Sequence, residues 1–184
     1  MTAWKLRLAK KIIRRGGIIA YPTEAVFGLG CDPLNFHAVE TLCQLKNRSL
    51  SKGLILIASH QDQLRGFVDL TPKQQQKLNT QLALPTTWIV PASKDCPPWL
   101  RGQHAGIAVR ITHHPLARQL CEHTGLALVS TSANISSRPP AKDALTVRRV
   151  FGQSLDLILH ADTGHFSQPS QIMDIRTNKR LRRG

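Results

Sequence analysis

Residues 107–134, IAVRITHHPLARQLCEHTGLALVSTSAN, show most clearly how this chain folds. Residues 107–111 and 126–129 are apolar runs of strand length, and residues 115–123 between them have apolar side chains at helical spacing. A strand, a helix and a second strand in succession are typical of α/β proteins, in which helices cover a sheet. This stretch therefore predicts an α/β fold.

The same alternation of strand and helix extends outward on both sides of this stretch. The other expected helices cover residues 4–15, about 39–46, a segment beginning at Thr71-Pro72, and 142–151. The other expected strands cover residues 18–21, 54–58, 88–90, 157–159 and 172–175. The sequence has no internal repeat and no low-complexity linker, so we expect residues 1–184 to form a single domain.

The chain is strongly basic, with 25 Lys+Arg against 11 Asp+Glu and a formal net charge of +14. The basic residues are concentrated near the two ends of the chain, at residues 5–15 and 176–183. Such clusters attract polyanions, so tRNA or double-stranded RNA is an expected partner of this surface. A solvated cationic surface with no dedicated partner is the alternative.

Composition excludes several other classes of protein. A hydrophobic fraction of 41% argues against disorder, and no apolar run approaches the roughly 20 residues that span a bilayer. The first residues also lack the apolar core of a secretory signal, so we expect a cytoplasmic protein that acts at no membrane. The four cysteines and eight histidines lack metal-ligand spacing, which predicts reduced thiols and no metal site built from protein ligands.

Residues 21–30, YPTEAVFGLG, form the first candidate site segment. Thr23 and Glu24 follow an expected strand, and we interpret Gly28 and Gly30 as part of a loop where the backbone approaches a ligand closely. The spacing matches neither the dinucleotide-binding pattern nor the P-loop pattern. A turn with a capping Thr is the competing interpretation.

Lys46, Arg48 and Lys52 form a second candidate segment after an expected helix. Alternate residues of an extended segment point to the same side, so Lys46 and Arg48 can converge on one anion. A compact ammonium beside a guanidinium fork suits a polyphosphate. Cations at the C-terminus of a helix also stabilise its dipole, and that structural interpretation is the alternative.

A third candidate segment is STSAN at residues 130–134, which follows the expected strand 126–129. The side chains of Ser130, Ser132 and Asn134 offer dense hydrogen bonding to a polar ligand. The same residue types also cap helices, so a purely structural role is the alternative.

Taken in order along the chain, these motifs resemble those of the YrdC/Sua5 family, and the likeness runs from about residue 10 to the C-terminus. The matching motifs are Tyr-Pro-Thr-Glu at 21–24, Lys-x-Arg at 46–48, Ala-Val-Arg at 108–110, Ser-x-Asn at 132–134, Pro-Ser-Gln-Ile at 169–172 and Arg-Arg-Gly at 182–184. The chain departs from the family pattern at Leu84 and Ser137, where the family has Gly, and at Ser49, where Pro is common. The resemblance implies a twisted mixed sheet with flanking helices and a basic central cavity.

The resemblance to the short, single-domain bacterial form of this family also implies an activity. Such proteins join L-threonine, bicarbonate or CO2, and ATP into L-threonylcarbamoyladenylate and release pyrophosphate. A threonylcarbamoyl transferase complex then uses the adenylate to modify tRNA. Magnesium is expected to accompany ATP, and we name no protein ligand for it because the motifs contain no cluster of carboxylates.

The resemblance assigns roles to residues of this chain at the matching positions. Catalysis is assigned to Lys46, Arg48, Ser132 and Asn134; threonine or carbamate binding to Thr23, Lys52, Arg110, Ser130, Ser132 and Ser170; and ATP binding to Lys46, Arg48, Asn134 and Arg182. Arg110 suits the carboxylate of threonine. The alternative function is a non-catalytic basic module for RNA binding or ribosome maturation, although the sequence has no aromatic RNA-binding signature.

Overall fold

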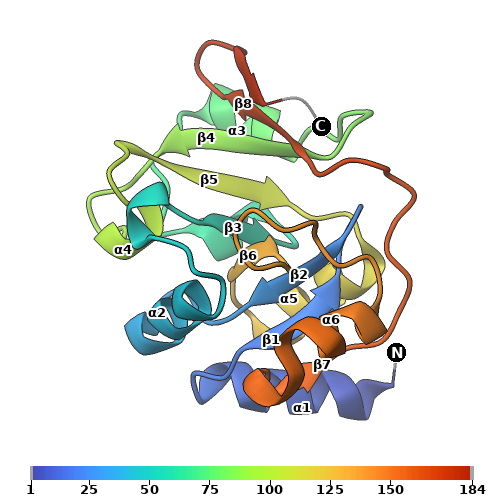
Figure 1. The fold of residues 1–184 in the computed structure, drawn as a ribbon. Helices are drawn as coiled ribbons and strands as arrows, with labels where there is room; N and C mark the ends of the chain where they lie inside the picture. Colours follow the sequence, from blue (N-terminus) through green and yellow to red (C-terminus); the bar gives the residue numbers. More distant parts are fainter. Residues whose placement is uncertain (1, 183–184) are drawn as a thin grey trace.

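The computed structural model describes residues 2–182, in which one mixed sheet of nine strands has the order β7-β1-β2-β6-β3-β5-β4-β8-β9 (Figure 1). The strands are β1 (Ile19–Pro22), β2 (Phe27–Gly30), β3 (Ile55–Ala58), β4 (Thr86–Pro91), β5 (Gly106–Ile111), β6 (Leu128–Ser132), β7 (Leu157–Ile158), β8 (Gln171–Asp174) and β9 (Arg180–Arg182). Parallel pairs join β1 to β7, β3 to β5 and β4 to β8, and the other neighbours are antiparallel. The predicted α/β fold with a mixed sheet and flanking helices is confirmed.

The helices begin and end where local chemistry favours it. They are α1 (Ala3–Arg14), α2 (Phe36–Leu45), α3 (Pro72–Asn79), α4 (Pro98–Arg101), α5 (Pro115–Thr124) and α6 (Ala144–Phe151), with single 3-10 turns η1 (Leu50–Lys52), η2 (Gln61–Leu64) and η3 (Gly152–Ser154). The side chain of Asn35 caps α2, and Thr71 and Gln74 form a reciprocal capping box on α3. Helix α5 stops at Gly125, whose φ of 75° is left-handed.

Helices cover both faces of the sheet because successive strand residues point to opposite sides. Ile19 and Tyr21 of β1 pack with α1 and α5 on one face, and Ala20 points into the larger cluster on the other. That larger cluster includes apolar residues of α2, α3, α4 and α6. The sheet is therefore buried on both sides, and side chains that bind a ligand need a gap in this packing.

The structure corrects several boundaries predicted from the sequence. Gly28 and Gly30 lie in strand β2, not in a loop, because β1 and β6 pair with this segment from either side. Strand β6 continues through Ser132, so Ser130 and Ser132 lie within the strand end and do not follow it. Strand β9 and the short helix α4 were not predicted.

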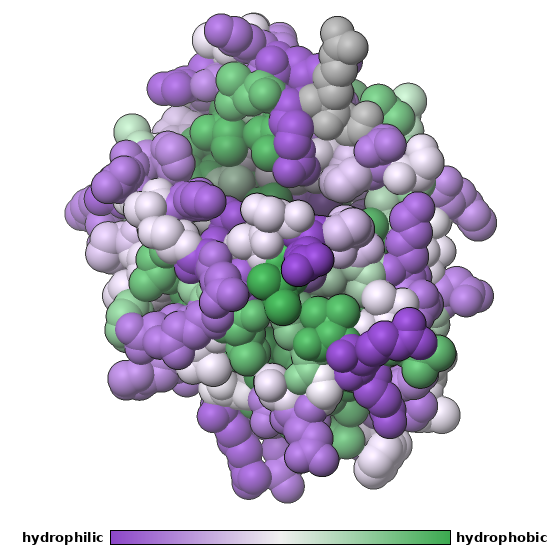
Figure 2. All heavy atoms as spheres, viewed as in Figure 1, coloured by the Kyte–Doolittle hydropathy of each residue, from purple (hydrophilic) through white to green (hydrophobic). Residues whose placement is uncertain are grey.

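The described residues of the two basic clusters, 5–15 and 176–182, lie far apart. Helix α1 packs at the β1–β7 end of the sheet, and β9 forms the opposite edge, so the clusters do not combine into one patch (Figure 1). Figure 2 shows hydrophilic side chains around the rim of the molecule and hydrophobic ones gathered toward the middle of the viewed face. Across residues 2–182, no helix has both the length and the apolar character needed to cross a membrane.

Candidate active site

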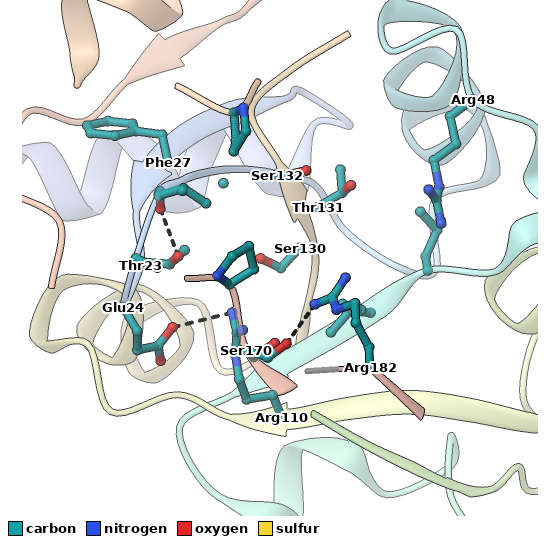
Figure 3. A pocket seen from close by; sticks show the side chains of 17 residues that line it. Thr23, Glu24, Phe27, Arg48, Arg110, Ser130, Thr131, Ser132, Ser170 and Arg182 are labelled. Atoms are coloured by element: carbon teal, nitrogen blue, oxygen red, sulfur yellow. Dashed lines mark hydrogen bonds and ion pairs between the residues drawn. The ribbon is translucent and has the colours of Figure 1, made fainter. Parts of the chain in front are cut away.

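A cavity of about 290 Å³ opens beside the middle strands of the sheet (Figure 3). Its wall comes from the β1–β2 turn, from the ends of β5 and β6, from residues on either side of η1, and from the segment that leads into β8 together with β9. The charged side chains on this wall are Arg48, Arg110, Arg182 and Glu24. Three guanidinium groups against one carboxylate make the described wall cationic, and Ser and Thr hydroxyls lie between them.

Arg110 and Glu24 form a buried ion pair on this wall. A nitrogen of the Arg110 guanidinium, Nη2, lies 3.4 Å from Glu24 Oε2, and both side chains are at least nine-tenths buried. From behind, Glu24 Oε1 accepts hydrogen bonds from Thr112 Oγ1 at 2.7 Å and from the backbone N–H of His113 at 3.2 Å. Burial acts to raise the pKa of Glu24, but Arg110 and the bond from Thr112 outweigh it and the pKa is lowered. Glu24 is therefore ionised at neutral pH.

The turn between β1 and β2 presents Thr23 to the cavity. Thr23 Oγ1 donates to the carbonyl of Val26 at 2.8 Å, which closes the turn and fixes the hydroxyl. Gly28 stands opposite: a Cβ there would lie 3.2 Å from Thr23 Cγ2 and 3.3 Å from Ser130 Oγ. The glycine thus keeps open a part of the cavity that any side chain would narrow.

Ser170 and Arg182 close the C-terminal side of the cavity. Ser170 shares a buried hydrogen bond with Thr87, their hydroxyl oxygens 2.8 Å apart, and its carbonyl accepts from Arg182 Nη2 at 2.7 Å. Burial, and then the charge of Arg110, lower the pKa of Arg182. This repulsion between two guanidinium groups is relieved when an anion binds between them.

Hydrogen bonds join Lys46, Ser132 and Asn134, and these bonds stabilise the turn that follows β6. The Lys46 ammonium donates to the carbonyl of Ser132, to the carbonyl of Asn134 at 2.6 Å and to Asn134 Oδ1 at 3.3 Å. Ser132 Oγ also donates to Asn134 Oδ1 at 2.6 Å. Burial lowers the pKa of Lys46 to about 8, and the nearby charge of Arg48 adds to this effect. In this structure Lys46 stabilises the turn after β6 and does not line the cavity.

Arg48 enters the cavity by a route that the sequence did not predict. Lys46 caps α2 in a helical conformation and Asn47 has a left-handed φ of 49°, so the segment is not extended and the predicted convergence by alternation is wrong. Arg48 Nη2 donates to the carbonyl of Gly53 at 2.8 Å, and its Nε is buried with no partner among the described residues. Lys52 is exposed on η1 and is not part of the cavity wall.

The structure thus brings most of the predicted site residues to one cavity. Those on its wall are Thr23, Arg48, Arg110, Ser130, Ser132, Ser170 and Arg182; those away from it are Lys46, Lys52 and Asn134. Sequence reasoning gave Glu24 no role, although it was the one acidic residue within the motifs. Its position in the Tyr-Pro-Thr-Glu segment was the available signal.

The described cavity wall offers a single carboxylate to a magnesium ion. Mg²⁺ prefers several oxygen ligands, carboxylates above all. Glu24 is the carboxylate on the described wall, and Arg110, Thr112 and His113 already engage it. Within residues 2–182, no group of three or more His, Cys, Asp or Glu side chains is placed to hold a metal.

The fold and the cavity define a mixed-sheet α/β protein with a cationic, hydroxyl-lined site. The Sua5/YciO/YrdC family model, described as "Telomere recombination", matches residues 11–184. This chain belongs to that family. Arg183 and Gly184, which complete the predicted terminal motif, lie outside the described residues.

Two relatives of high sequence identity carry the same name. A threonylcarbamoyl-AMP synthase from Nitrosococcus oceani is 55% identical over 180 residues, covering 97% of both chains. A threonylcarbamoyl-AMP synthase from Methylobacillus flagellatus is 48% identical over 97% of this chain and 99% of the relative. The crystal structure of P. abyssi Sua5 with L-threonine superposes with a TM-score of 0.87 at 29% identity. That alignment covers 95% of this chain and 52% of the Sua5 chain, so this chain spans about half its length.

Proposed function

We propose that this chain is a threonylcarbamoyl-AMP synthase, a nucleotidyltransferase that makes L-threonylcarbamoyladenylate and pyrophosphate from L-threonine, bicarbonate or CO2, and ATP. One observation carries the proposal. Arg48 and Arg110 both line the cavity with buried Nε atoms that have no hydrogen-bond partner among the described residues. A buried N–H left without an acceptor is costly, and anionic substrates supply the missing acceptors. The names of the close relatives support the same activity.

The proposed reaction needs positioning and charge neutralisation more than covalent help from the protein. Threonine and bicarbonate give the threonine carbamate and water. A carbamate oxygen then attacks the α-phosphorus of ATP, and the bond to the β-phosphate oxygen breaks to release pyrophosphate. Arg48 and Arg182 stabilise the charge on the phosphates, and Arg110 binds the threonine carboxylate. Thr23, Ser130, Ser132 and Ser170 supply hydrogen bonds to the remaining polar groups.

Lys46 and Asn134 act in this proposal from behind the cavity wall. Their mutual hydrogen bonds hold Ser132 at the wall, so they position a residue that touches substrate. Magnesium bound to ATP would neutralise part of the phosphate charge, and phosphate oxygens and water would supply its ligands.

The proposed product serves a downstream threonylcarbamoyl transferase complex that modifies tRNA, and the cytoplasm is where these substrates occur together. The exposed basic side chains of α1, including Lys5, Arg7 and Lys11, suit transient contact with tRNA or double-stranded RNA. The names of the relatives do not favour a non-catalytic RNA-binding module. RNA contact is therefore an addition to the proposed activity and does not replace it.

Pyrophosphate release tests this proposal with a matched pair of variants. We expect purified protein to release pyrophosphate from ATP when both threonine and bicarbonate are present. Arg48→Ala removes a cavity cation and is expected to abolish that release, whereas Arg149→Ala removes an exposed cation of α6 and leaves the rate unchanged. Release that does not depend on threonine would contradict the proposal.

A further inference from the structure

Glu24 is the negatively charged residue on a described cavity wall whose other charged side chains are positive. The other charged side chains on the described wall are guanidinium groups, which suit the phosphates and carboxylates of the substrates. A carboxylate in such a site repels those anions. A purely structural role would not require Glu24 to reach the cavity surface, because Thr112 and His113 already satisfy its Oε1 from behind.

The second carboxylate oxygen of Glu24, Oε2, accepts no hydrogen bond from the described residues. Oε2 is buried, its contact with Arg110 being an ion pair at 3.4 Å, and the residue itself is part of the cavity wall. Arg110 also has an unsatisfied group, because its buried Nε donates no hydrogen bond to the described residues. Figure 3 shows the two side chains pointing toward one another at the end of the cavity away from Arg48.

An adjacent pair with one free acceptor and one free donor complements a ligand that carries both charges on neighbouring atoms. An α-amino acid is such a ligand, since its ammonium and carboxylate share one carbon. We propose that Glu24 is a substrate-binding residue, whose Oε2 accepts from the α-ammonium of threonine while Arg110 binds the α-carboxylate. This inference rests on the proposed function and adds the residue that recognises the amino group.

The charge of Glu24 supports this assignment. Its lowered pKa keeps the carboxylate ionised at the pH where the threonine amine is protonated, so the contact is charge-assisted. It also gives the cavity two distinct ends, with Arg48 at the nucleotide end and the Glu24–Arg110 pair at the amino-acid end (Figure 3). The carboxylate thus selects an amino acid over a simple hydroxy acid.

Calorimetry with paired ligands tests the contact. (R)-3-Hydroxybutyrate keeps the carboxylate and the hydroxyl of threonine but lacks the amine. We expect the wild-type protein to bind L-threonine at least about tenfold more tightly than this analogue, the factor that a charge-assisted hydrogen bond supplies. Equal binding of the two ligands would overturn the inference, whereas failure of both to bind would overturn the proposed function itself.

Glu24→Gln separates contact with the amine from positioning of Arg110. We expect E24Q to lose about tenfold or more in threonine affinity without weakening the binding of (R)-3-hydroxybutyrate, whose carboxylate no longer meets the negative charge of Glu24. If Glu24 only positions Arg110, both ligands weaken equally, and the inference is wrong. Glu122→Gln makes the same change at an exposed ion pair with Arg118 and is expected to alter neither affinity.

A measurement on the wild-type chain covers the case in which E24Q does not fold. With the glutamate side chains labelled with 13C, the carboxyl resonance of Glu24 should shift when threonine is added and stay in place with (R)-3-hydroxybutyrate. A resonance that responds equally to both ligands would overturn the contact without any substitution.

Discussion

Replacing Lys46 by Met should destabilise the fold, because Lys46 holds the turn after β6. Met fills a similar volume but cannot donate a hydrogen bond. Lys46 is the donor to the carbonyl of Asn134, whereas the carbonyl of Ser132 and Asn134 Oδ1 each keep another donor. The change therefore leaves one part-buried carbonyl without a donor and weakens two further acceptors.

The magnitude follows from these contacts. An unsatisfied buried carbonyl costs about 1–3 kcal/mol, and each weakened acceptor costs a fraction of the roughly 0.5–1.5 kcal/mol of a typical hydrogen bond. Removing a buried charge, whose pKa is already lowered to about 8, offsets part of this cost. We expect a net loss of about 1–3 kcal/mol in the free energy of unfolding.

Thermal unfolding followed by circular dichroism measures this loss. At this chain length each kcal/mol corresponds to about 2–4 °C, so the Tm should fall by roughly 2–12 °C. Lys11→Met is the control, because Lys11 is exposed on α1 and is expected to change stability by less than about 0.5 kcal/mol. A Lys46→Met protein as stable as the Lys11→Met protein would refute this role for Lys46.

Three further predictions concern the cavity end of the sheet. Gly30→Ala places a Cβ 2.5 Å from the carbonyl of Val129, so urea unfolding should show a loss of about 1–3 kcal/mol; an unchanged midpoint would count against the packing. In Gly28→Ala the atoms nearest the added Cβ belong to side chains, which can shift, so we expect near-normal stability. Calorimetry should show weaker threonine binding because the Cβ narrows the cavity, and unaltered affinity would place threonine elsewhere. Because the pKa of Glu24 is lowered in the fold, its stabilisation is complete above about pH 4.5 and is lost as the pH falls through the lowered value. Acid unfolding of E24Q should lack this component, and identical acid profiles would contradict it.

Local patterns predicted the elements whose signal is contained within their own residues. The amphipathic helices α1 and α5 and the apolar strands β3 and β5 are of this kind. Strand β2 was missed because its two glycines disfavour a strand, and pairing with β1 and β6 overrides that preference. Strand β9 was missed because its charged residues resemble a tail, and pairing with β8 places it in the sheet.

The same limit of local sequence patterns applies to the candidate site. The motifs identified Arg48, Arg110 and Ser132 as site residues, and all three line one cavity. The partnership of Glu24 with Arg110 joins residues far apart in the sequence and has no local signal. The holding role of Lys46 depends on a left-handed Asn47, on the carbonyl of Ser132 at the end of β6 and on that of Asn134 beyond it, which spacing alone does not show.

The most direct test of the proposed activity is to follow the carbon of bicarbonate into the product. Purified wild-type protein is incubated with ATP, L-threonine and 13C-labelled bicarbonate, and the nucleotide products are identified by mass spectrometry. We predict threonylcarbamoyl-AMP that is one mass unit heavier than the product made from unlabelled bicarbonate. Absence of this adenylate, or an adenylate that gains no label, would contradict the account.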